Sequence, residues 1–225
     1  MGIDMESGNA YADVENVLDI NKLTINSENT FSKKTSCQKP RPRPKIFSSN
    51  LTDCLALDCE FVGVGPHGKE HMVARVSIVN ERGEVLLDSY VKPQKTVIDY
   101  RTTISGIRPE LMESGQEYLT IRDTVRLLLQ GRILVGHALK NDLMVLNLRH
   151  PKKMIRDTSH HRPIARRIRA IGTPSLKNLS KLILGEEIQT GIHDSIQDAR
   201  AAMKIYLLFR EDWEKSLKKL SRRSR

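Results

Sequence analysis

The run from Leu55 to Val62 constrains the fold more than any other stretch of the sequence. It is almost continuously apolar and is interrupted only by Asp58 and Glu60. A short apolar run of this kind predicts a β-strand buried in a sheet. Because side chains alternate along a strand, Asp58 and Glu60 project from the same face. Burying two carboxylates is costly unless another group compensates their charge.

Two explanations of this acidic pair are open. A divalent cation would compensate both charges, because hard cations take oxygen ligands. Alternatively, the end of the strand emerges into solvent, where a carboxylate needs no partner. Asp-x-Glu is a short pattern and does not decide between them.

The rest of the sequence predicts a mixed α/β fold. Residues 72–79 and 85–91 predict two further strands, joined by a hairpin at 80–83. The other expected elements are a loop over 92–108, a helix in one or two pieces over 109–130, strands at 133–136 and 153–156, helices over 137–150 and 174–184, and a last helix with Ser195 as its N-cap. This order predicts a mixed five-stranded sheet with an early antiparallel hairpin, flanked by helices.

Composition divides the chain into three parts. Residues 1–49 are expected to be a disordered extension that ends in a basic, Pro-rich linker at 39–45, since alternating Pro prevents helix formation and strand pairing. Residues 50–212 are expected to form the folded domain, and 213–225 a basic tail. The linker has three readings: a nuclear-localisation signal, a patch that contacts RNA, or a plain solvated spacer.

The overall charge favours a polyanionic partner. The formal net charge is +10, from 37 Lys and Arg against 27 Asp and Glu, and such an excess favours nucleic acid. Basic tails that only aid solubility would give the same excess. No apolar run is long enough to span a bilayer, so no membrane partner is expected. Three cysteines without paired spacing favour a reducing compartment.

Two further segments place acidic side chains toward the sheet. Asp142 follows the strand at 133–136, and Asp198 falls in the first turn of the last helix, five residues after His193. Each has a plain structural reading as well. Asp142 would be an ordinary acid at the positive end of a helix dipole. Asp198 would be only a capping residue, and His193 an ordinary loop histidine.

The three segments together resemble the DEDDh exonucleases of the RNase H-like fold, a family that includes RNase T and proofreading exonucleases. The similarity extends beyond the acidic residues and is strongest for RNA exonucleases of that family. The segments that carry it are 57–66, 74–80, 99–102, 105–107, 131–138, 155–158 and 195–199, within about residues 53–210.

This resemblance implies a metal-dependent 3′→5′ exonuclease. In the family, four carboxylates hold two divalent cations, Mg²⁺ or Mn²⁺, and here these would be Asp58, Glu60, Asp142 and Asp198. Such a pair stabilises charge on the attacking and leaving oxygens of a phosphodiester. His193 would accept a proton from the attacking water, and the ordinary pKa of an imidazole, about 6.5, suits a base near neutral pH.

The resemblance also implies substrate contacts, each with a structural alternative. Phe61 would receive the terminal nucleotide, although strand alternation points it away from the acids. Arg101 would grip the backbone or ribose, or would pin its own loop. His137 would approach the site, or would be a packed or capping histidine. A basic stretch offers candidate phosphate contacts, with a solvated loop as the rival reading: Arg166, Arg167, Arg169 and Lys177.

We therefore expect a 3′→5′ exoribonuclease of the nucleus, or of the nucleolus, that acts in processing or decay of RNA such as rRNA. The preference for RNA rests on the resemblance alone. A DNA-directed exonuclease that cuts single-stranded DNA and an inert RNA-binding protein are the alternatives. A monomer is the default oligomeric state.

Overall fold

The structure is a computed structural model that describes residues 50–223. All of them belong to one compact unit, Ser48–Arg225. The predicted disorder of 1–49 lies outside the described residues.

The core of the unit is a mixed sheet, as predicted. Its strands are β1 (Cys54–Val64), β2 (Glu70–Asn80), β3 (Val85–Tyr90), β5 (Ile133–Gly136) and β6 (Ile155–Asp157), in the order β3-β2-β1-β5-β6. The pairs β1–β2 and β2–β3 are antiparallel, whereas β1–β5 and β5–β6 are parallel. A sixth short strand, β4 (Val97–Asp99), pairs with the end of β1. It lies in a segment that was expected to be only a loop.

Side-chain hydrogen bonds support the predicted turn between β2 and β3. The Asn80 side-chain oxygen accepts hydrogen bonds from the backbone N–H groups of Arg82 and Glu84. Gly83 has a φ of 79°, a conformation that glycine adopts without strain. The turn therefore follows from local chemistry that the sequence displays.

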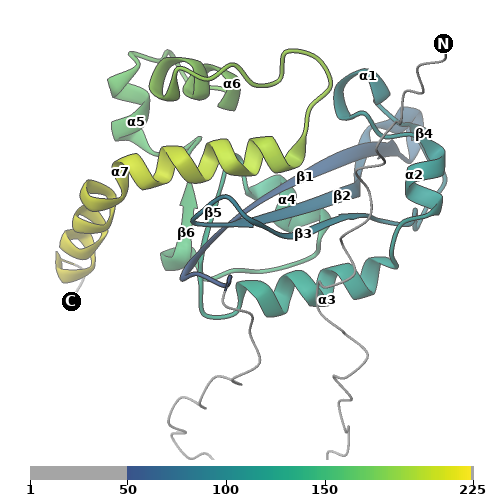
Figure 1. Cartoon of the computed structure of the whole chain (residues 1–225), viewed down its shortest axis with the longest axis horizontal. Coiled ribbons are helices and arrows are strands. Elements are labelled where there is room, and N and C mark those ends of the chain that lie inside the picture. Colours follow the sequence, from purple (N-terminus) through teal and green to yellow (C-terminus); the bar gives the residue numbers. More distant parts are fainter. Residues whose placement is uncertain (1–49, 224–225) are drawn as a thin grey trace, which may run out of the picture. The chain divides into compact units, whose positions relative to one another are not determined.

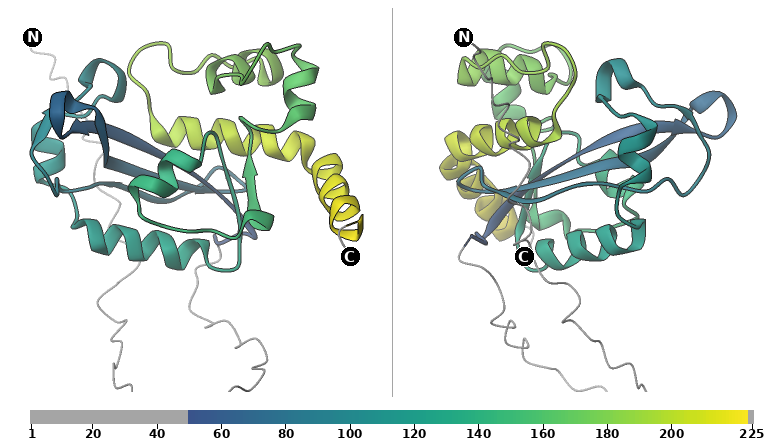
Figure 2. Two further views of the ribbon diagram at one scale, coloured as in Figure 1. Left: turned by 180° about the vertical axis from the view of Figure 1, so that it is seen from behind. Right: turned by 45° about the vertical axis from the view of Figure 1, so that its right-hand side comes forward.

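Helices cover both faces of the sheet (Figures 1 and 2). The longer ones are α3 (Tyr118–Leu129) and α7 (Ser195–Arg223). The shorter helical elements are η2 (Pro66–Gly68), α1 (Thr102–Ser105), α2 (Pro109–Glu113), α4 (Lys140–Val145), η3 (Lys152–Met154), α5 (Arg162–Arg167), α6 (Leu176–Leu179) and η4 (Ser180–Leu184). None of the helices within 50–223 is long and apolar enough to cross a membrane.

Alternation along β1 sorts its side chains between two cores. Leu55, Leu57 and Cys59 join the cluster that contains the buried face of α3. Cys54 and Ala56 join the cluster that contains the buried face of α7. By the same alternation, Asp58 and Glu60 belong to the α7 side. The strand thus carries its two acids toward the last helix.

The helix predicted over 137–150 is wrong in extent, because only Lys140–Val145 is helical. Ala138 has a φ of 59°, which breaks the helix before it can start at His137. The Asp157 carboxylate accepts hydrogen bonds from the N–H groups of Ala138 and Leu139. This contact from β6 fixes the entry to α4.

The last helix passes through the boundary predicted at 212. Residues from 213 were expected to form a tail, but α7 continues to Arg223. Trp213 is only 6% exposed, and its ring stacks on His161 at 3.6 Å. Glu214 pairs with Arg156 at 2.6 Å. These contacts explain why the helix does not end at the expected point.

Candidate active site

The four acidic side chains come from three elements that meet beside β1. Ala56 forms the last parallel pair with β5, so Asp58 lies just beyond that pairing, where the chain leaves Gly136 toward α4. Asp142 is in the first turn of α4, and Asp198 is in the first turn of α7. Glu60, Asp142 and Asp198 are 6%, 4% and 4% exposed, respectively, whereas Asp58 is half-buried.

Burial raises the pKa of every one of these acids, and the charge of a nearby carboxylate adds to the effect in each case. The pKa of Asp58 is well above its usual value because of burial and then because of the charges of Asp142, Asp198 and Glu60. Burial raises the pKa of Glu60 to about 7, and the charge of Asp198 adds to the effect. Burial also raises the pKa of Asp142 to about 7. The charges of Asp142 and Asp198 act on both Asp58 and Glu60, so the four carboxylates form one electrostatic cluster.

Gln189 orients the last of the four acids, and sequence reasoning missed it. Its side-chain amide donates a hydrogen bond of 2.6 Å to Asp198 Oδ2. Asp198 Oδ1 is buried and has no hydrogen-bond partner. The Gln189 backbone has a φ of 55°, and its carbonyl accepts a hydrogen bond from Lys177 Nζ at 2.8 Å. One oxygen of Asp198 is therefore held and the other is left for a ligand.

We expect Gln189→Leu to lower nuclease activity about 10- to 100-fold, the usual cost of removing a partner of a metal-binding side chain. The loss should shrink as the divalent-cation concentration rises, because the carboxylate remains present. A cation titration of activity measures this. Thr190→Leu, at the exposed neighbouring position, is the matched control. A loss in Gln189→Leu that no cation concentration reduces would contradict the assignment.

His193 lies beside Asp198 at the entry to α7. The backbone N–H of His193 donates a hydrogen bond of 2.7 Å to the carbonyl of Ile104. This bond joins the loop before α7 to the segment around α1. The pKa of Asp198 is raised by burial, while the Gln189 hydrogen bond and the charge of His193 act in the opposite direction. His193 is half-buried. The structure thus brings all five predicted catalytic residues to one place.

The N-cap of α7 is Asp194, and the prediction of Ser195 is wrong. Asp194 Oδ1 accepts a hydrogen bond from the Ile196 N–H at 3.2 Å, as a capping side chain does. Ser195 is the first helical residue, and its hydroxyl lies 2.6 Å from that of Ser77 on β2. The hydroxyl of Ser195 is therefore used to anchor the helix to the sheet.

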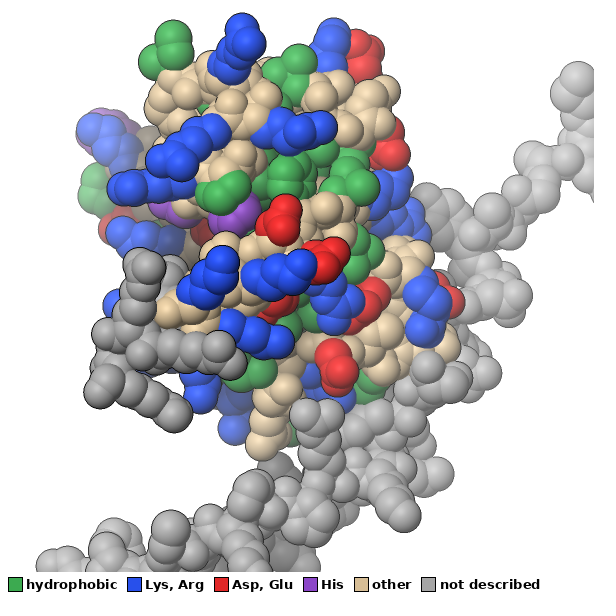
Figure 3. All heavy atoms as spheres, turned by 90° about the vertical axis from the view of Figure 1, so that its left-hand side faces the viewer, with side chains coloured by type: hydrophobic (Ala, Val, Ile, Leu, Met, Phe, Trp, Pro, Cys, Tyr) green, Lys and Arg blue, Asp and Glu red, His purple; other side chains and the backbone are tan. Residues whose placement is uncertain are grey.

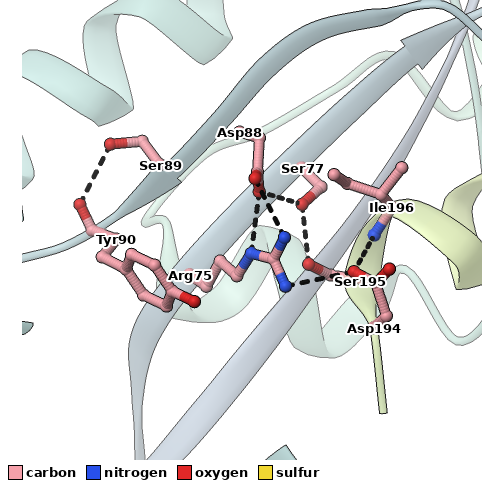
Figure 4. Close-up of polar contacts among 8 residues, drawn as sticks. All are labelled: Arg75, Ser77, Asp88, Ser89, Tyr90, Asp194, Ser195 and Ile196. Atoms are coloured by element: carbon pink, nitrogen blue, oxygen red, sulfur yellow. Dashed lines mark hydrogen bonds and ion pairs between the residues drawn. The ribbon is translucent and has the colours of Figure 1, made fainter. Parts of the chain in front are cut away.

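A polar network centred on Arg75 fixes this end of α7 (Figure 4). Arg75 Nε and Nη2 donate to both oxygens of Asp88 at 2.8 and 2.9 Å, and Nη1 reaches Asp194 at 3.1 Å. Ser77 also donates to Asp88, at 2.8 Å. The charge of Arg75 opposes the rise in the pKa of Glu60. The network therefore positions the residue next to His193 and moderates the repulsion inside the acid cluster.

Three side chains that were predicted to contact substrate make contacts within the fold: Phe61, Arg101 and His137. Phe61 packs against the core cluster that contains the buried face of α3, on the opposite face of β1 from Asp58 and Glu60. Its ring centre lies 5.8 Å from that of His71. Arg101 donates to the Gly68 carbonyl at 3.0 Å and lies 2.8 Å from His71 Nδ1, which favours the loop-pinning alternative. The His137 Nδ1 atom lies 2.9 Å from the Thr158 hydroxyl, as expected of a packed histidine.

The acid cluster fits divalent cations by its donor chemistry. It offers carboxylate oxygens only, the ligands that Mg²⁺ and Mn²⁺ prefer, and one of these oxygens is buried without a partner. Within residues 50–223, no three His, Cys, Asp or Glu side chains are already arranged to hold an ion. Holding a cation therefore requires these side chains to turn toward one another.

Comparison with known proteins agrees with this fold and cluster. Residues 55–206 match the family described as RNase T, exonuclease. The match covers all four acids and His193. The chain therefore belongs to the RNase T family of exonucleases.

Among its relatives are proteins called RNA exonuclease 4. The chain is 55% identical to that of Mus musculus over 166 residues, which is 74% of this chain and 38% of the relative. It is 49% identical to that of Saccharomyces cerevisiae, over 75% of this chain and 58% of the relative. It thus spans only part of these relatives. The segments given in the sequence analysis resemble RNA exonuclease 4 and the interferon-stimulated exonuclease. The resemblance to RNA exonuclease 4 is confirmed by these matches.

Solved structures support the same fold. The Pan2 catalytic unit of Neurospora crassa, a protease and nuclease domain, matches with a TM-score of 0.62 and 28% identity over 78% of this chain and 30% of that chain. A Saccharomyces cerevisiae Pan2 exonuclease module in complex with AAGGAA RNA matches with a TM-score of 0.60 and 31% identity. This match covers 76% of this chain and 32% of that chain.

Proposed function

We propose that this protein is a 3′→5′ exoribonuclease that hydrolyses the terminal phosphodiester of RNA. The observation that carries the proposal is the cluster of four carboxylates with raised pKa values and with His193 beside it. Such a cluster is unfavourable by itself, since burial disfavours the charged form of each acid and the charges of the other three raise the pKa of Asp58. An inert binding protein has no need of it, whereas metal-assisted phosphodiester hydrolysis does.

The residues have separate roles in this proposal. Asp58, Glu60, Asp142 and Asp198 would hold the cations, which stabilise charge on the attacking and leaving oxygens when bound. His193 accepts the proton of the attacking water. The Arg75 network and the hydrogen bond to Ile104 keep His193 at the edge of the cluster.

RNA, and not DNA, is the proposed substrate because of the relatives. Those that match over most of this chain are called RNA exonuclease 4, and the Pan2 module was solved with RNA. We extend the proposal to processing or decay of nuclear RNA. The basic segment 39–45 supports a nuclear location.

We expect RNA to be degraded in preference to DNA when matched single strands of identical sequence compete. The measurement is the ratio of kcat/KM values from one reaction that contains both strands with different labels. A chimera with a single 3′-terminal ribonucleotide on DNA shows whether the terminal 2′-hydroxyl is sufficient. A ratio that favours DNA would overturn the RNA assignment and leave the exonuclease assignment in place.

A further inference from the structure

Helix α5 has one basic face and one buried face. Arg162 and Arg166 are four residues apart on one side of the helix, and Arg169 follows just beyond its last turn, with a φ of 51°. All three are exposed. On the other side, Ile164 is fully buried and Ile168 packs against the α7-side core. The apolar face anchors the helix and leaves the arginines in solvent.

These arginines have no anionic partner within residues 50–223. No ion pair or hydrogen bond involves the side chain of Arg162, Arg166, Arg167 or Arg169. Several other guanidinium groups of the unit are paired, as those of Arg156 with Glu214 and Arg210 with Glu81 are. The charge on α5 is therefore uncompensated, which suits an external anion.

The basic helix lies on the same side of the sheet as the acid cluster, since Ile164 packs in the core cluster that contains the buried face of α7. Helix α5 begins five residues after Asp157, the last residue of β6. Asp157 contacts the entry to α4 and raises the pKa of Asp142, so it lies beside the cluster. The loop after α5 returns toward the end of β5, since the Pro174 backbone acts on the pKa of His137. Figure 3 shows one face of the unit, on which Lys and Arg side chains are exposed among acidic, histidine and apolar ones.

We propose that the basic face of α5, formed by Arg162, Arg166, Arg167 and Arg169, binds the RNA backbone on the 5′ side of the bond that is cut. This inference rests on the proposed function. An exonuclease removes the terminal nucleotide, so only the 5′ part of the strand extends beyond the acid cluster. A guanidinium group matches a phosphate with two parallel hydrogen bonds, and the basic face repeats this donor along the helix. Such contacts give affinity without base preference.

The test is the salt dependence of RNA binding in EDTA, where no hydrolysis is expected. The variant is Arg166→Ala/Arg169→Ala. The control, Arg122→Ala/Arg126→Ala on α3, removes the same charge from the opposite side of the sheet. Fluorescence anisotropy of a labelled single-stranded 20-mer gives log K against log[KCl]. Each lost phosphate contact lowers the magnitude of the slope by about 0.7, so we expect a decrease of about 1.4 for the α5 variant and almost none for the control.

A second readout separates this proposal from the proposed function. Hydrolysis of the p-nitrophenyl ester of thymidine 5′-phosphate with Mn²⁺ needs the acid cluster but no upstream strand, so the α5 variant should keep the wild-type rate. An unchanged slope in the α5 variant, an equal decrease in the control, or a loss of ester hydrolysis would overturn the role of α5. If wild-type protein hydrolyses neither ester nor RNA, the proposed function fails, while the binding slopes still test the surface.

Discussion

Asp58→Asn should reduce the rate of RNA shortening in Mg²⁺ by at least about 10³-fold, because a carboxylate that holds a catalytic cation contributes several kcal/mol. The charges of all three other acids raise the pKa of Asp58, namely those of Asp142, Asp198 and Glu60. Asn keeps the shape of the side chain and removes its charge. Single-turnover kinetics with excess enzyme measure the rate of the chemical step.

Asp123→Asn is the matched control for this substitution. Asp123 lies on α3, on the opposite side of the sheet, and its exposed carboxylate contacts Arg122 and Arg126. This variant loses the same charge and should keep the wild-type rate. If Asp58→Asn is folded and also keeps that rate, the assignment of the acid cluster is wrong.

In EDTA, the protein should become less stable as the pH rises from about 4 to about 7. The folded-state pKa of Glu60 is raised from 4.5 to about 7. Between these values the unfolded chain releases its proton while the folded chain retains it, so the free energy of unfolding decreases with pH and then levels off. The shift of Glu60 alone corresponds to about 3 kcal/mol. Asp142 changes stability in the same direction, because its pKa is also raised to about 7.

Urea unfolding at a series of pH values in EDTA measures this effect. Asp58→Asn removes a group whose own pKa is raised, so the stability of this variant should decrease less across the same range. Mg²⁺ should stabilise the wild-type protein at pH 8 and have almost no effect at pH 4, where the carboxylates are protonated. A free energy of unfolding that rises with pH in EDTA would show that the acids are not buried together.

The parts of the fold that depend on local pattern were predictable. The strand from Leu55 to Val62 and the turn at 80–83 follow from periodicity and turn chemistry. The shared face of Asp58 and Glu60 follows from strand alternation, and the structure adds that this face is the one against α7. The approach of Asp142 and Asp198 to that face followed from helix faces, and the family resemblance joined them into one set.

The remaining features depend on contacts between distant segments. Gln189 and Asp198 lie on either side of the turn into α7, and only the folded chain shows which oxygen of Asp198 is held. The contact of Arg75 with Asp194 joins β2 to the end of α7 across more than one hundred residues of sequence. The continuation of α7 beyond 212 depends on the stacking of Trp213 on His161. No window of local sequence carries these contacts.

The central claim is tested most directly by the products formed from a 5′-labelled single-stranded RNA with a free 3′-hydroxyl. In Mg²⁺, wild-type protein should produce a ladder of labelled fragments that shorten one nucleotide at a time, and EDTA or Asp198→Asn should abolish the ladder. An intact RNA, a single internal cut, or immediate release of the labelled 5′ nucleotide would contradict a 3′→5′ exoribonuclease.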